Sequence, residues 1–169
     1  MGLHERFQNE RAWSKGRPEV STGADIEKAM FGAPHIPRAL RKDEYMSYAA
    51  ALAYARDHQP NPLDRSKSLK ELRAKILSLC SDTMQPMKFY TAIGTPLDTY
   101  HGIDAFFEQG STTVTLDVSG REKENHKADV LIHARLNDDG ELVCDSKEID
   151  RVAREVAHRL NRNYHKKAA

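Results

Sequence analysis

Hydrophobic positions with the period of an α-helix occur in three segments of the chain and predict three amphipathic helices. The first spans residues 43–58 and is rich in alanine, a strong helix former. The second begins at the capping-box sequence Ser68-Leu69-Lys70-Glu71, and the third follows Asp145-Ser146, which can cap its first turn. The apolar faces expected of the three helices are Tyr45, Tyr48, Ala49, Leu52 and Ala53; Leu69, Leu72, Ile76 and Leu79; and Ile149, Val152, Val156 and Leu160.

Between the second and third helices the pattern changes from helical to extended. Apolar and polar residues alternate strictly over residues 112–119, which predicts a half-buried strand. The Asn137-Asp138-Asp139-Gly140 sequence predicts a tight turn into a strand over residues 141–144. Three other strands are expected, over residues 89–93, 103–107 and 128–136. Helices before and after a run of strands predict an α+β fold with a mixed, mostly antiparallel central sheet flanked by helices.

The first 40 or so residues are interrupted by glycine and proline, apart from a short helix that Thr22 can cap. We therefore expect an irregular or helical N-terminal extension. The chain divides into an N-terminal arm and helix (1–62), an α/β core (63–162) and a basic tail (163–169). If the arm wraps a second copy of the chain, the protein is a homo-oligomer.

Composition narrows the classes of protein without naming one. The chain has 169 residues, of which 39% are hydrophobic and 30% charged, a length and balance typical of one folded domain. Its mean hydropathy is −0.70, and no apolar run approaches the roughly 20 residues of a membrane-spanning helix. The charged N-terminus lacks the apolar core of a secretory signal, so we expect a cytoplasmic protein with no membrane partner.

Two aspartates, Asp104 and Asp117, lie on successive predicted strands. If these strands pair as a hairpin about a turn near Gly110, both aspartates fall near the same end of the pair. Asp117 belongs to the polar face of its strand, and Asp104 can point the same way. Two carboxylates that share a small volume favour a hard cation such as Mg²⁺ or Mn²⁺. The alternative is that both are ordinary solvent-facing strand residues.

The Gly-Ile-Asp sequence ending at Asp104 and the Leu-Asp-Val-Ser sequence around Asp117 resemble the restriction-endonuclease-like, or PD-(D/E)XK, nuclease superfamily. The resemblance covers roughly residues 66–160, including the helices and strands around the two motifs. It implies a mixed sheet flanked by helices and Mg²⁺-dependent cleavage of phosphodiester bonds. Asp104 would be the first metal ligand and Asp117 the second, and Asp98 or Glu71 would supply the further acid that many members use.

This chain departs from the family pattern at Ser119, where members carry a lysine two positions after the second acid. In the family that lysine orients or deprotonates the attacking water and offsets developing charge. Lys123 is the residue best placed to reach in from the following turn, ahead of Lys127 and Arg121; without such a substitute the site would be weak or inactive.

His101, close in sequence to Asp98 and Asp104, is a candidate general base or metal ligand, and the alternative is a hydrogen-bonded loop residue. The sequence therefore predicts a metal-dependent nuclease acting on DNA or RNA. The alternative is a non-catalytic nucleic-acid-binding or oligomeric assembly module with the same fold. Such a module would bind through the C-terminal helix, where basic residues from Arg151 onward outnumber the single acid Glu155.

Overall fold

The computed structural model describes residues 22–34, 36, 44–58, 66–81, 85–121 and 123–168, with side chains described as far as residue 162. The described helices are α2 (Gly23–Phe31), α3 (Tyr48–Asp57), α4 (Lys67–Leu79), α5 (Pro96–His101) and α6 (Ser146–Ala168). The described strands are β1 (Met87–Thr91), β2 (Ala105–Gln109), β3 (Thr112–Ser119), β4 (Val130–His133), β5 (Arg135–Leu136) and β6 (Leu142–Val143).

The central sheet has the strand order β1-β2-β3-β4. The pairs β1–β2 and β2–β3 are antiparallel, and β4 lies parallel to β3. A second, two-stranded sheet is the β5–β6 hairpin, whose turn ends at Gly140 with a φ of +77°. The predicted α+β fold, with a mixed and mostly antiparallel sheet flanked by helices, is thus confirmed.

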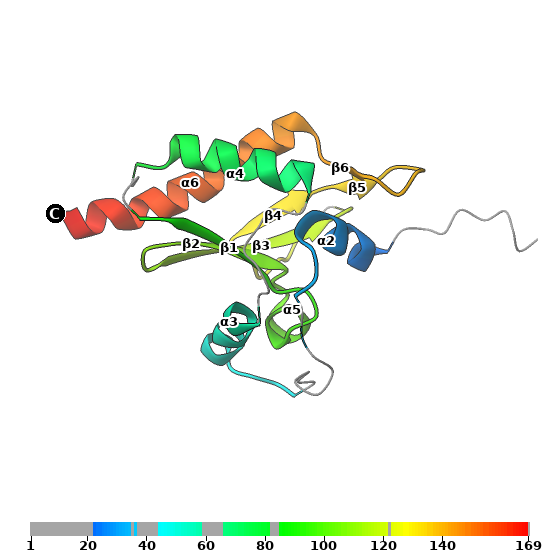
Figure 1. Ribbon diagram of the computed structural model, residues 1–169, viewed down its shortest axis with the longest axis horizontal. Helices are drawn as coiled ribbons and strands as arrows, with labels where there is room; N and C mark the ends of the chain where they lie inside the picture. Colours follow the sequence, from blue (N-terminus) through cyan, green and yellow to red (C-terminus); the bar gives the residue numbers. More distant parts are fainter. Residues whose placement is uncertain are drawn as a thin grey trace, which may run out of the picture.

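Helices cover the sheet on both faces (Figure 1). Helices α4 and α6 lie side by side on one face, whereas α3 and α5 lie on the other, and α2 sits at the end of β3. Strand alternation sends Phe107 and Leu116 into the core beneath α4 and α6, and Phe106 into a smaller core with α3 and α5. Polar residues of β3 therefore face the side of the sheet that carries α3 and α5.

All three predicted helices are present, but the one expected over 43–58 begins only at Tyr48, and other details also differ. The cap of α4 is Ser66, whose Oγ accepts from the Leu69 N–H at 3.0 Å, rather than Ser68. Leu79, expected in the core, is 45% exposed at the helix end. In the helix expected over 43–58 the buried residues are Ala51, Tyr54 and Ala55, so the predicted apolar face was wrong. Apolar residues occupy several sides of that helix, so tertiary packing decides which side faces the core.

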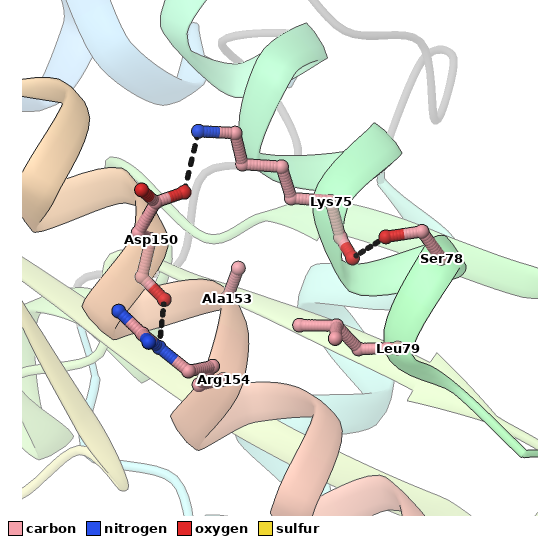
Figure 2. Close-up of a pocket in the computed structure, with 6 residues that line it drawn as sticks. All are labelled: Lys75, Ser78, Leu79, Asp150, Ala153 and Arg154. Atoms are coloured by element: carbon pink, nitrogen blue, oxygen red, sulfur yellow. Dashed lines mark hydrogen bonds and ion pairs between the residues drawn. The ribbon is translucent and has the colours of Figure 1, made fainter.

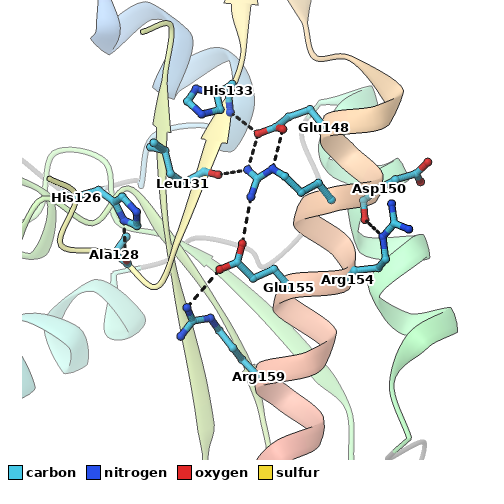
Figure 3. A network of polar contacts seen from close by, with 10 residues as sticks. His126, Ala128, Leu131, His133, Glu148, Asp150, Arg154, Glu155 and Arg159 are labelled. Carbon is cyan, nitrogen blue, oxygen red and sulfur yellow. Dashed lines mark hydrogen bonds and ion pairs between the residues drawn. The ribbon is translucent and has the colours of Figure 1, made fainter. Parts of the chain in front are cut away.

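Hydrogen bonds join α6 to β4, and ion pairs engage two of its arginines (Figure 3). Arg151 pairs with Glu148 at 2.6 Å and with Glu155 at 3.1 Å, and it donates to the Leu131 carbonyl. Arg159 pairs with Asp129 and Glu155, each at 3.3 Å. Two of the arginines in the described part of α6, Arg151 and Arg159, are therefore neutralised by nearby carboxylates.

No helix among the described residues combines the length and the apolar character needed to cross a bilayer.

Candidate functional site

The β2–β3 hairpin brings Asp104 and Asp117 together at one end. Its register pairs Ala105 with Leu116, so the next step places Asp104 opposite Asp117, and the Asp104 N–H donates to the Leu116 carbonyl at 2.9 Å. Neither aspartate is solvent-facing, because Asp104 is 3% exposed and Asp117 5% exposed. The predicted hairpin geometry is confirmed, and the alternative of two ordinary surface aspartates was wrong.

Helix α5 adds a third carboxylate, from Asp98. The sequence pattern gave no prediction of this helix, whose N-cap is Thr95, with its Oγ1 accepting from the Leu97 N–H at 3.3 Å. Gly94, with a φ of +75°, turns its N–H onto Asp98 Oδ2 at 2.8 Å. Gly102 ends the helix in the left-handed region, where a residue without Cβ costs least. The turn chemistry on both sides of α5 thus holds Asp98 toward the end of the hairpin.

Helix α2 adds a fourth carboxylate, Glu27, which the sequence analysis missed. A capping box between Thr22 and Asp25 starts this helix, and Ile26 and Met30 pack into the main core. Gly120 permits the close approach of α2 to the end of β3, because a Cβ there would lie 2.9 Å from Ile26 Cδ1. The capped apolar helix was visible in the sequence, but nothing in it linked Glu27 to residues 98–117.

Three of these carboxylates are close enough to bind one ion. One oxygen each from Glu27, Asp98 and Asp104 lie within 4.8 Å of one another. Two oxygens on one ion are at most about 4.2 Å apart for Mg²⁺ and about 5.2 Å for Ca²⁺. Since all the donors are carboxylate oxygens, the set fits a hard divalent cation, and small side-chain rotations would bring the three oxygens to Mg²⁺ or Mn²⁺ distances.

Burial and mutual repulsion disfavour the charged forms of these acids. Burial, followed by the charges of Glu27, Asp117 and Asp98, raises the pKa of Asp104 to about 8, although its Oδ2 accepts from the Val118 N–H at 2.8 Å. Burial also raises the pKa of Asp98 and of Glu27, and neighbouring carboxylates add to both shifts. The cluster is therefore short of positive charge, and a divalent cation would supply it.

Lys123 is the cation that the structure does place at this site. Its Nζ lies 2.9 Å from both Asp117 oxygens, and its side chain is 41% exposed, whereas that of Asp117 is 8% exposed. It is also close enough to Glu27 to lower the pKa of that acid. Ser119, at the position of the family's lysine, is buried and accepts from the Arg121 N–H at 3.2 Å.

We expect Lys123→Met to destabilise the metal-free protein at neutral pH by about 1–3 kcal/mol, because it leaves the buried Asp117 carboxylate without its cation. The exposed Lys70 on α4 provides the matched control, and Lys70→Met should leave stability unchanged. Urea denaturation of both variants measures the difference. Equal stability of the two variants would show that Lys123 contributes nothing to holding Asp117.

Two residues predicted for the site lie elsewhere. His101 Nε2 is 2.9 Å from the Met46 carbonyl, and its ring lies between Tyr45 and Tyr48, with centroids 5.9 and 5.7 Å away. These contacts match the hydrogen-bonded alternative, and the ring is engaged away from the carboxylates. The predicted catalytic or metal-binding role of His101 therefore has no support in the geometry.

Glu71 lies on α4, on the opposite face of the sheet from Asp117. Its Oε1 is 3.2 Å from Lys75 Nζ, which also pairs with Asp150 at 2.5 Å (Figure 2). Both residues of this second ion pair line an open cavity of about 310 Å³ between α4 and α6. The prediction of Glu71 as the additional acid was thus wrong. Asp98, the alternative candidate, lies close to Asp104.

No family model matches the chain, and comparison with curated proteins and with solved structures gave no match.

Proposed function

We propose that this protein is a divalent-metal-dependent phosphodiesterase that cleaves nucleic acid. The observation that carries the proposal is the convergence of four carboxylates and one lysine at the end of the β2–β3 hairpin. The carboxylates come from Glu27, Asp98, Asp104 and Asp117, and the lysine is Lys123. Besides β3 and the turn after it, these groups come from α2, from α5 and from the residue before β2. No single local sequence motif therefore explains why they lie together.

A purely structural role accounts poorly for this arrangement. Unpaired buried carboxylates cost stability, and folded proteins avoid gathering them without a cation. Lys123, a cation beside them, has its Nζ on Asp117, while Glu27, Asp98 and Asp104 face each other. Groups with strongly shifted pKa values tend to mark functional sites. This supports a site built to take a divalent ion.

Mg²⁺ or Mn²⁺, when bound, supplies a Lewis acid that lowers the pKa of a coordinated water and stabilises the negative charge developing on an attacked phosphodiester. Glu27, Asp98 and Asp104 would hold the ion, with Asp117 next to them. Asp104 is oriented by the Val118 N–H at its Oδ2. Because its carboxyl holds a proton up to about pH 8, it must release that proton to become a ligand, so ion affinity rises with pH.

Lys123 has the role in this proposal that a lysine two positions after the second acid has in the PD-(D/E)XK family. The Lys123 side chain is partly exposed, and its ammonium group forms an ion pair with Asp117. From there it can hold the attacking water or offset charge on the phosphate oxygens. Ser119 then need not carry the function, because the cation arrives from the turn that follows β3.

Incubation with end-labelled DNA and RNA oligonucleotides, with Mg²⁺, Mn²⁺ or EDTA, tests the proposal. We expect cleavage with either ion and none in EDTA. Lys123→Met should lower the rate by about 10- to 100-fold while Lys70→Met leaves it unchanged. Absence of cleavage of any oligonucleotide with both ions at millimolar concentration would overturn the catalytic proposal.

A further inference from the structure

Two tyrosines that pack against α5, the helix that carries Asp98, have large exposed fractions. The Tyr45 side chain is 71% exposed and that of Tyr48 45% exposed. Large aromatic groups lose favourable burial when they face water, and a pair of them on one surface marks a place where something else packs.

These tyrosines are held in place rather than loosely attached. The His101 ring packs against both, and its Nε2 is 2.9 Å from the carbonyl of the intervening Met46. Tyr45 also meets the Tyr100 ring edge to face, with centroids 5.7 Å apart. The rings of Tyr45, Tyr48 and Tyr100 therefore form a preorganised aromatic surface, which binds a flat ligand at little cost in conformational entropy.

The aromatic surface and the carboxylate site share two elements. Helix α5 carries Asp98 of the site and, two residues on, Tyr100 of the aromatic surface. The segment after β3 carries Lys123 at the site and the exposed Lys127, whose Nζ is 3.4 Å from the Tyr100 carbonyl. The aromatic surface is therefore joined to the carboxylate site through α5 and through residues 123–127.

An exposed lysine beside the aromatic surface favours a polyanion as its ligand. Lys127 lies next to Tyr100, Lys123 lies four residues earlier on Asp117, and the nearby Asp129 is neutralised by Arg159 at 3.3 Å. A phosphate chain running past these lysines would bring unpaired bases to the tyrosine rings. Bases inside a duplex are stacked on each other and offer no free face to an aromatic side chain, whereas those of a single strand do.

We propose that the aromatic surface of Tyr45, Tyr48 and Tyr100 stacks with bases of a single-stranded nucleic acid and that its backbone passes Lys127 to the carboxylate site. Single-stranded nucleic acid would then be the substrate class of the phosphodiesterase proposed above. The path of the backbone toward the carboxylates rests on that proposed function. Stacking on aromatic rings is tolerant of sequence, so binding is expected to be single-strand-specific but weakly base-specific.

Fluorescence anisotropy in EDTA, with a labelled single-stranded oligonucleotide and the matching duplex, measures binding apart from cleavage. We expect the single strand to bind more tightly. Tyr45→Ala should weaken its binding about 5- to 100-fold, whereas Tyr45→Phe, which keeps the ring, should retain it. Leu79→Ala, an exposed apolar residue on the opposite face, is the control and should bind normally.

The melting temperature of each variant distinguishes a binding defect from unfolding. Because the substituted side chains are exposed, we expect all the variants to melt at the wild-type temperature. Equal binding of single strand and duplex, or an unaffected Tyr45→Ala variant, would overturn the inference even if cleavage occurs. Tyrosine-dependent single-strand binding in a protein that never cleaves would support the binding surface and count against the catalytic proposal instead. Failure to bind any oligonucleotide would leave the surface to a protein partner and overturn the inference.

Discussion

Asp104→Asn is expected to lower metal-dependent cleavage by about 100-fold or more and, at the same time, to make the metal-free protein more stable. The activity falls because an amide is a poorer ligand for a hard cation than a carboxylate. The stability rises because an amide is neutral without a proton, whereas the Asp104 carboxyl, whose pKa is raised to about 8 chiefly by burial, must keep its proton to stay neutral in the folded protein. The amide oxygen can still accept from the Val118 N–H.

The stability gain depends on pH in a defined direction. The proton on Asp104 is held to about pH 8 in the folded chain, but in the unfolded chain it is lost near the ordinary value of 3.8. Between these values the folded state binds more protons, so the free energy of unfolding decreases as pH rises. Asp104→Asn removes this pH-dependent decrease. We expect the free energy of unfolding of the variant to exceed that of the wild type by about 1–2 kcal/mol at pH 8 and by little at pH 4.

Asp150→Asn provides the matched control for this prediction. It makes the same chemical change at an exposed carboxylate on α6, where Asp150 pairs with Lys75. We expect it to leave cleavage unchanged and to gain no stability at pH 8. Urea denaturation of the three proteins at pH 4, 6 and 8 gives the comparison. If Asp104→Asn were destabilising at pH 8, the carboxylates would not be in mutual repulsion and our account of the cluster would be incorrect.

Mn²⁺ or Mg²⁺ should raise the melting temperature by about 5–10 °C at pH 8 when the ion is present at about 100 times its dissociation constant. The ion stabilises the folded state because only the folded chain brings the carboxylates of Glu27, Asp98 and Asp104 together. At pH 5 the proton on Asp104 competes with the ion, so we expect a much smaller shift.

Thermal denaturation with and without each ion, at both pH values, measures this effect. In the Asp104→Asn variant the ion-dependent shift should largely disappear, and in Asp150→Asn it should persist. A shift of the same size at pH 5 and pH 8, or one unaffected by Asp104→Asn, would mean that the ion binds at another place on the protein.

Local patterns were sufficient to predict the hairpin that carries the first two carboxylates. Strict alternation over Thr112–Ser119 fixed which side of β3 carries Asp117, and the turn near Gly110 set the register that brings Asp104 opposite. Both signals act over a few residues, where backbone geometry dominates. The same reasoning could not show that Asp117 is buried, because its burial depends on segments such as α2 that reach the end of β3 from elsewhere in the chain.

The remaining site residues depend on contacts between distant segments. Glu27 reaches the hairpin only because α2 packs against the end of β3 at Gly120, more than 90 residues later in the chain. Glu71 and His101 were plausible from their positions in sequence, but α4 turns Glu71 to the other face and Met46 holds the His101 ring. Residue spacing contains no information about such long-range packing.

The most direct test of the central claim is a crystal structure of the protein grown with Mn²⁺ near pH 8, with anomalous diffraction data that locate the ion. We predict one strong anomalous peak within bonding distance of oxygens of Asp104, Asp98 and Glu27, with the ion pair between Lys123 and Asp117 retained. An absence of any peak among these carboxylates, with ordered side chains that point away from one another, would contradict the account.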